Sequence, residues 1–229
     1  MSSILAMEPG AYRLTVSCDG YHTEPAEITA LERPGAGKDA KATVTVTRSF
    51  PGVFEGSAGA SLGGWVKTHT VELEDTDEWT LPFTLDATTP RASFHLVMDE
   101  AVANLHTDCA VNIYDAAGNP VRRGAFDGTE AHTGISLPAG ETSATYKLEV
   151  VGAFAIAEDM KDWGFEVEER YHFASPVSGS VRGQGRGDLR MYCGVPAELK
   201  LSFDGEWPAA PDGMGYFGSV RFEDAYTSD

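Results

Sequence analysis

Apolar side chains recur at every second residue in several short stretches of the chain. Residues Trp79–Leu85 alternate four apolar side chains with threonine and proline, and Ala92–Met98 and Tyr146–Val151 are further apolar strand candidates. Alternation of this kind has the period of a β-strand that buries one face. Turn-forming residues separate such stretches about every eight to twelve residues from Phe50 onward. The sequence therefore predicts an all-β fold of antiparallel β-sandwiches, jelly-roll or immunoglobulin-like, with at most one or two short helical turns.

The clearest local unit is a predicted hairpin over 108–123. Val111 and Ile113 should face inward on its first strand, and Gly118 with Asn119 provides the turn. Pro82 cannot donate to a neighbouring strand, so its strand should lie at a sheet edge or a bulge. The segment Asp99–Leu105 is ambiguous, since its helical propensity is compatible with one short helical turn.

The first part of the chain carries a strand pattern with a family resemblance. Pro9-Gly10-x-Tyr12-x-Leu14-x-Val16, followed by Gly20-Tyr21, resembles the closing strands of carboxypeptidase regulatory-like (prealbumin-like) domains. The resemblance covers about residues 8–47 and implies a partial sandwich, because the earlier strands of that family are missing. We expect either a piece of a longer surface or secreted protein or a domain completed by strands from elsewhere.

A second resemblance covers about residues 52–173. Its motifs, in order, are Asp77-Glu-Trp79, Phe94-His-Leu-Val97, Asp108 through Gly118, Leu137-Pro-Ala-Gly140 with Tyr146-x-Leu148-x-Val150, and Trp163-x-Phe165-x-Val167. This order resembles the bacterial pre-peptidase C-terminal domains, although Asp99–Thr107 and Glu141–Thr145 depart from their pattern. The resemblance implies an accessory domain of secreted peptidases and related surface enzymes. Some relatives bind extracellular matrix or polysaccharide, some bind calcium, and some are removed in maturation.

Three segments follow from these patterns. We predict partial regulatory-like strands over 1–48, a sandwich resembling the pre-peptidase C-terminal domains over 49–175, and additional strands over 176–229. The last segment either completes a sandwich or starts a second copy, since Ala197–Asp204 loosely echoes the strands of 77–98.

The charge of the chain restricts its partners. There are 35 acidic and 17 basic side chains, a formal net charge of −18. Such a surface repels phosphate backbones and anionic lipids, so nucleic acid is not expected. No stretch approaches the roughly 18 apolar residues of a membrane span. We expect an extracellular protein or polysaccharide, or an adjacent domain of a larger chain, as the partner, with an extracellular or cell-surface location although no signal peptide is visible.

Catalytic signatures are not apparent in the sequence. The six histidines are scattered, no Gly-x-Ser-x-Gly elbow occurs, and Cys18, Cys109 and Cys193 form no local zinc-binding pair. The pairing of these cysteines stays open. We therefore expect a protein that is not an enzyme.

A run of carboxylates follows the strand that begins at Trp65. Glu74, Asp75 and Asp77, with Glu72 and Glu78 beside them, could supply several of the six to eight oxygens that Ca²⁺ takes. Calcium is the cofactor expected if any is bound. The rival interpretation is a solvated acidic edge, because the chain is acidic throughout.

Aromatic residues provide the candidate ligand platform. Trp207 lies beside prolines and glycine in a loop, and Tyr216 follows it, so their flat faces could stack on a sugar ring. Core packing is the rival account. The expected function is a non-catalytic accessory or binding module of a secreted or cell-surface bacterial protein. The alternatives are the C-terminal fragment of a secreted peptidase and a structural stalk of tandem sandwiches.

Overall fold

The computed structural model covers the whole chain, and its described part excludes several segments. The described residues are 6–8, 11–14, 17–18, 21–22, 26–29, 40–47, 51–74, 78–103, 109–152, 162–183, 189–203, 207–211 and 213–224.

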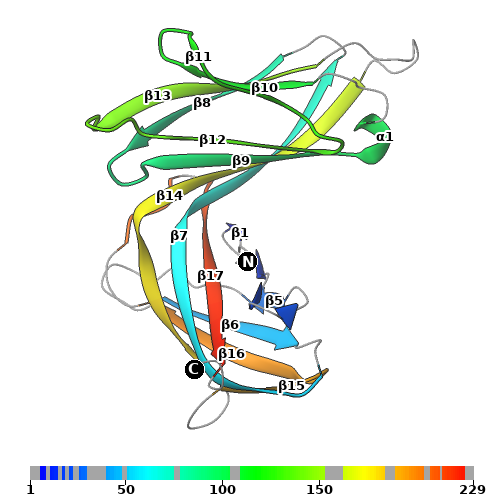
Figure 1. Cartoon of the computed structure of the whole chain (residues 1–229), viewed down its shortest axis with the longest axis vertical. Helices are drawn as coiled ribbons and strands as arrows, with labels where there is room; N and C mark the ends of the chain where they lie inside the picture. The colour runs from blue at the N-terminus through cyan, green and yellow to red at the C-terminus, as the bar shows by residue number, and fades with distance from the viewer. Residues whose placement is uncertain are drawn as a thin grey trace. The chain divides into compact units, whose positions relative to one another are not determined.

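Strands dominate the described residues, as the alternation predicts (Figure 1). Their bounds are β1 Ala6–Glu8, β2 Ala11–Leu14, β3 Ser17–Cys18, β4 Tyr21–His22, β5 Ala26–Thr29, β6 Ala40–Thr47, β7 Val53–Glu74, β8 Glu78–Asp86, β9 Arg91–Met98, β10 Ala110–Asp115, β11 Pro120–Ala125, β12 Glu130–Ser136, β13 Ser143–Val151, β14 Asp162–Arg182, β15 Leu189–Tyr192, β16 Pro196–Phe203 and β17 Gly215–Asp224. One short helix, α1 (Glu100–Ala103), lies in the segment that the sequence leaves ambiguous. None of the described helical segments is long and apolar enough to cross a membrane.

Contacts divide the chain into two compact units. The first comprises Met1–Val66 together with Ser175–Asp229, and the second comprises Lys67–Ala174. The segments predicted over 1–48 and 176–229 thus belong to one unit. Strands β7 and β14 each contribute residues to both units.

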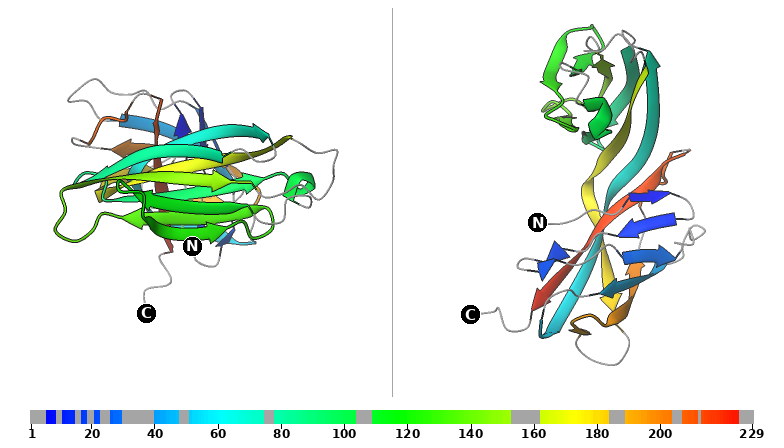
Figure 2. Two further views of the ribbon diagram at one scale, coloured as in Figure 1. Left: turned by 90° about the horizontal axis from the view of Figure 1, so that it is seen from above. Right: turned by 90° about the vertical axis from the view of Figure 1, so that its right-hand side faces the viewer.

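Unit Lys67–Ala174 is a β-sandwich of two sheets. One sheet has the order β11-β10-β13-β8, and the other contains β12, β9, β14 and β7. Neighbouring strands such as β10 and β13, or β9 and β14, run antiparallel. Figure 2 shows from a second direction that β10, β11 and β13 form a layer separate from β7 and β14 within this unit. The predicted antiparallel sandwich is confirmed.

The core of this unit follows from the alternation in β8. Phe83 and Leu85 are buried, whereas Pro82 and Thr84 are exposed, and β8 is the edge strand predicted for Pro82. The Phe83 ring meets the ring of Phe94 on the opposite sheet, with centroids 4.9 Å apart, and lies 5.6 Å from that of Tyr146. Such aromatic pairs contribute beyond the area that they bury. These rings join the two sheets.

The predicted hairpin over 108–123 is also confirmed. Val111 and Ile113 are fully buried, and β10 pairs with β11 in antiparallel register. The Asp115 carboxylate accepts hydrogen bonds from the backbone N–H groups of Ala117 and Asn119 at 2.9 and 2.8 Å. Gly118 has a φ of 83°, a conformation that glycine adopts without steric cost.

The other unit has its own hydrophobic core. Its sheet includes the neighbours β6, β16, β14, β7 and β15, with β17 paired to β7 (Figure 1). Buried residues include Phe54, Leu199, Leu201, Phe203 and Phe222. The rings of Phe54 and Phe222 meet edge to face, with centroids 5.6 Å apart.

Regular turns do not extend through the two longest strands. β7 has 22 residues and β14 has 21, so the prediction of a turn about every eight to twelve residues is wrong there. The glycines of β7 permit close packing instead. A Cβ on Gly56 would lie 2.0 Å from the carbonyl oxygen of Glu223, and one on Gly63 would lie 2.7 Å from the ring of Phe217. Glycine in a strand marks such close approaches as well as turns.

Candidate functional site

The outer face of β9, β12 and β14 brings polar residues together within unit Lys67–Ala174. His132 pairs across the strands with His95, and His95 pairs on its other side with Glu168. The next row along contains Gly134, Ser93 and Arg170. Because side chains alternate between the two faces of a strand, these residues share the face opposite the core. The neighbours Phe94 and Leu96 are buried on the inner side.

A concavity of about 560 Å³ begins on this face and continues around β12, the edge strand of the sheet, to Arg122 on β11 of the other sheet. Its lining residues are Arg91, Ser93, Phe94, His95, Arg122, His132, Thr133, Gly134, Ile135, Ser136 and Arg170. This volume falls within the usual range of about 300–1,000 Å³ for small-molecule sites. Gly134 is required beside it, because a Cβ there would lie 2.7 Å from the carbonyl oxygen of Ala92. The absence of a side chain at 134 lets β12 approach β9.

The lining of this concavity has the opposite charge to the chain. Arg91, Arg122 and Arg170 contribute three guanidinium groups to the lining. Two carboxylates contact lining residues from beside the concavity, Glu168 at Arg170 and Glu130 at His95 and His132. The chain as a whole carries a net charge of −18. The Arg170 guanidinium forms an ion pair with Glu168, so its charge is partly compensated. Arg91 lies on β9, and Arg122 lies on β11 of the other sheet. Arginine presents a planar fork of donors that matches carboxylate and sulfate-like groups.

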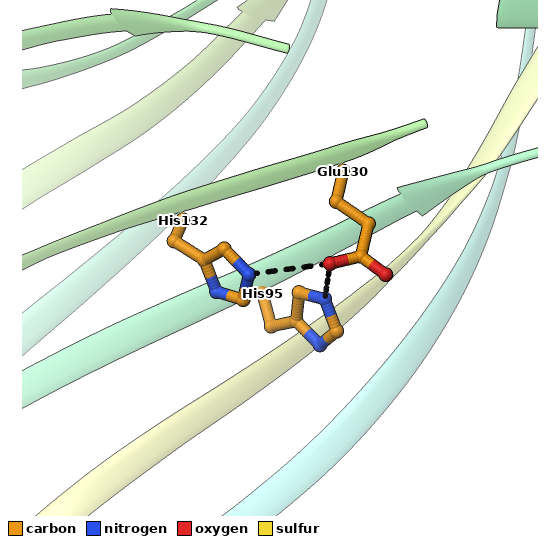
Figure 3. Close-up of side chains that lie close together, drawn as sticks. All are labelled: His95, Glu130 and His132. Carbon is orange, nitrogen blue, oxygen red and sulfur yellow. Dashed lines mark ion pairs between the residues drawn. The ribbon is translucent and has the colours of Figure 1, made fainter. Parts of the chain in front are cut away.

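Two histidines and a glutamate gather at one side of the concavity (Figure 3). The Nε2 atoms of His95 and His132 each lie 3.5 Å from Oε2 of Glu130. The two imidazole rings stack with centroids 4.2 Å apart and planes 5° from parallel. Glu130 and His132 are neighbours on one face of β12 because they are two residues apart, and the register places His95 opposite His132.

His172 lies at the other end of the same face, in register with Arg91. Its Nε2 is 2.8 Å from the hydroxyl oxygen of Ser93. Burial, with the nearby positive charges of Arg91 and Arg170, lowers the pKa of His172 to about 4. The imidazole of His172 is therefore uncharged in the folded protein at neutral pH.

Stability should depend on pH through His172. Its pKa is about 4 when folded and near 6.5 when unfolded, so the unfolded state binds more protons between those values. The free energy of unfolding should then fall as pH falls from about 6.5 to 4, by about 1–2 kcal/mol after allowance for partial exposure. Urea denaturation of the wild type and of His172→Gln at pH 7 and pH 4.5 measures this. Equal losses of stability in the two proteins would contradict the assignment.

A second histidine–carboxylate pair lies apart from the concavity lining. His69 Nε2 is 2.9 Å from Oε2 of Glu169, and Glu169 is only 2% exposed. Burial raises the pKa of Glu169, and the hydrogen bond from His69 acts in the opposite direction. The His69 ring also meets Trp79 with centroids 5.8 Å apart. His69 provides a hydrogen-bond partner for the buried carboxylate of Glu169, which gives the pair a structural role.

The aromatic platform predicted at Trp207 and Tyr216 lies in the unit of Met1–Val66 and Ser175–Asp229. Both side chains are partly buried and pack against the core of that unit. The Tyr216 hydroxyl accepts a hydrogen bond from the N–H of Ala210 at 2.9 Å and donates one to the carbonyl of Pro208 at 3.0 Å. Tyr216 therefore holds the loop that follows Trp207. Sugar binding at these two residues stays a prediction.

The predicted calcium ligands are described only in part. Glu74 ends β7 and is exposed, and its backbone carbonyl accepts a hydrogen bond from the indole N–H of Trp163 at 3.3 Å. Asp75 and Asp77 lie outside the described residues, so calcium binding there stays a prediction. Among the described thiols, that of Cys109 is buried and that of Cys193 is exposed.

The sequence does not predict the cluster of His95, Glu130 and His132. His95 interrupts an apolar strand and so reads as a packed or surface histidine, and His132 lies 37 residues further along. The spacing of Glu130 and His132 on a predicted strand gives a signal, since residues two apart share a face. The pairing of β9 with β12, which brings His95 to them, depends on the sheet order.

Comparisons with known proteins find no protein family for this chain. No family model matches it, and no curated protein matches its sequence. The two resemblances inferred from sequence motifs therefore stay predictions.

Solved structures give distant likenesses to β-rich proteins. The Yersinia pseudotuberculosis-derived mitogen is 12% identical, with 57% of this chain and 97% of the mitogen covered, at a TM-score of 0.32. The VP2 subviral particle of infectious bursal disease virus is 11% identical, with 96% and 75% covered, at a TM-score of 0.28. The CBM51-2 and INT domains of Clostridium perfringens ZmpB are 11% identical, with 72% and 44% covered, also at 0.28. Similarities this low carry no functional argument.

Proposed function

We propose that this protein is a binding module whose unit Lys67–Ala174 holds an acidic saccharide in the concavity lined by β9, β12, β14 and Arg122 of β11. The observation that carries the proposal is the presence of Arg91, Arg122 and Arg170 in the lining of one concavity, in a chain of net charge −18. Arg170 is paired with Glu168, so Arg91 and Arg122 are the cations that would bind the ligand. A local cationic site in an acidic protein selects an anionic partner, because the remaining surface repels it.

The other lining groups favour a saccharide among anionic ligands. Ser93, Thr133 and Ser136 offer hydroxyl groups, and His95 and His132 offer imidazole nitrogens, all of which can hydrogen-bond to sugar hydroxyls. Only Phe94 and Ile135 are large apolar residues of the lining, and Phe94 is itself buried in the core. An apolar ligand would find little surface to cover. Such a module would bind its ligand without any chemical reaction, in agreement with the accessory role expected from the sequence.

Retention on polysaccharides tests this proposal. Chelator-treated protein should bind heparin or polygalacturonate and should not bind dextran, and raising the salt concentration should weaken the binding because ions screen the guanidinium charges. An acidic peptide, polyglutamate, serves as a competitor of the same charge. Binding to dextran as strong as to the acidic polymers, binding to none of them, or preferential binding of polyglutamate would overturn the proposal.

A further inference from the structure

We infer that His95, Glu130 and His132 form a zinc site on the outer face of the β12–β9 pair. The inference rests on these three ligand atoms and not on the acidic-saccharide proposal. Two imidazole nitrogens and one carboxylate oxygen are the donors that Zn²⁺ takes at sites with an open coordination position. All three atoms lie within 4.8 Å of one another.

The distances bring both nitrogens near the carboxylate oxygen without forming usual hydrogen bonds. Zinc binds nitrogen and carboxylate oxygen at about 2.0–2.2 Å, so two ligands on the edge of a tetrahedron are about 3.3–3.5 Å apart. Each Nε2 lies 3.5 Å from Oε2 of Glu130, beyond the usual 2.7–3.2 Å of an N–H···O hydrogen bond. Figure 3 shows both rings directed at the same carboxylate oxygen.

The environment of His95 supports the same assignment. Its Nε2 atom is shielded from solvent and has no hydrogen-bond partner among the described residues. A buried polar nitrogen without such a partner is costly, and coordination to a metal would satisfy it. Glu130 and His132 are exposed, with 53% and 68% of their side chains accessible, so an ion can reach them.

Binding requires one local adjustment. A metal lies in the plane of each imidazole that binds it, whereas the two rings are stacked nearly parallel. The rings must therefore rotate apart when the ion enters, and the exposure of His132 leaves room for this. The fourth position then stays open to water or to an anionic group of a ligand in the neighbouring concavity.

The donor set favours zinc over calcium. Calcium takes six to eight oxygen ligands, and this cluster offers one carboxylate with two nitrogens. The site is also distinct from Glu74, Asp75 and Asp77, the residues predicted from the sequence to bind calcium.

Titration calorimetry of untagged, chelator-treated protein with zinc chloride and calcium chloride tests the inference. We expect one zinc ion per chain and no competition from calcium. His132→Asn and Glu130→Gln should each weaken zinc binding by about tenfold or more, since even supporting residues around a metal contribute about 10–100-fold. Glu166→Gln is the matched control, because Glu166 is exposed on the same face and pairs with Val97 on the side of β9 opposite Glu130.

Cobalt absorption and the two variants distinguish this zinc site from other metal-binding residues of the chain. Substitution with Co²⁺ should give the visible absorption of histidine-bound cobalt in the wild type and lose it in His132→Asn. Zinc affinity that is unchanged in His132→Asn and Glu130→Gln, or equal to that for calcium, would overturn the inference, because the ion would then lie elsewhere, for example at the exposed Cys193. Loss of zinc binding in the Glu166→Gln control would also overturn it.

Discussion

Phe83→Ala should destabilise the sandwich of unit Lys67–Ala174 by about 3–5 kcal/mol, a large effect for a single substitution. Phe83 is 5% exposed and its ring contacts Phe94, Tyr146 and Tyr171 from both sheets. Removing the ring leaves a cavity between the layers that β-strands cannot fill without shifting backbone hydrogen bonds.

Urea denaturation followed by circular dichroism measures the loss for Phe83→Ala. Val97→Ala is the control, because Val97 lies on the outer face of β9 with 38% of its surface accessible, and it should cost well under about 1 kcal/mol. Equal effects of the two substitutions would contradict the packing of the two sheets through Phe83.

Replacing Arg91 and Arg122 together by glutamine should weaken binding of an acidic saccharide by about 100-fold. Each arginine makes charge-assisted hydrogen bonds worth about 1.5–3 kcal/mol, and about 1.4 kcal/mol corresponds to tenfold in affinity. Both arginines are exposed at the concavity, so the sandwich core should be unaffected. Calorimetry with an acidic oligosaccharide, supported by thermal melts of each variant, measures the change.

The matched control is a double variant that removes two positive charges outside the concavity. Arg182 and Arg190 are exposed and lie outside the concavity, in the other unit, so replacing both by glutamine changes the net charge equally. We expect this control to bind within about twofold of the wild type, because neither arginine lines the concavity and exposed charges are screened at physiological salt. A similar loss in both double variants would mean that overall charge, and not the concavity, determines the affinity.

Local patterns predict much of the sandwich. Alternation identifies β8 with its buried Phe83 and Leu85, and the Gly118 turn identifies the β10–β11 hairpin. Both features depend on residues close in sequence, whose side-chain period and turn chemistry are set by the backbone. The lengths of β7 and β14 are missed, because glycines that allow close approach resemble glycines that form turns.

The candidate site could not be predicted in the same way. His95 and His132 meet only because β12 pairs with β9, and Arg170 reaches the same face through β14. These pairings join residues far apart in the chain, and the order of strands in a sheet is not encoded in a local period. The residues that the sequence favours, Trp207 and Tyr216, stand out by their loop composition and lie in the other unit.

The most direct test of the account is to map where an acidic oligosaccharide binds by NMR of the isotope-labelled, chelator-treated protein. We predict that the chemical-shift changes concentrate in the amides of β9, β12 and β14 and in the side-chain Nε–H groups of Arg91, Arg122 and Arg170. Changes centred on the indole of Trp207 and the strand that carries Tyr216, with those three strands unaffected, would contradict it.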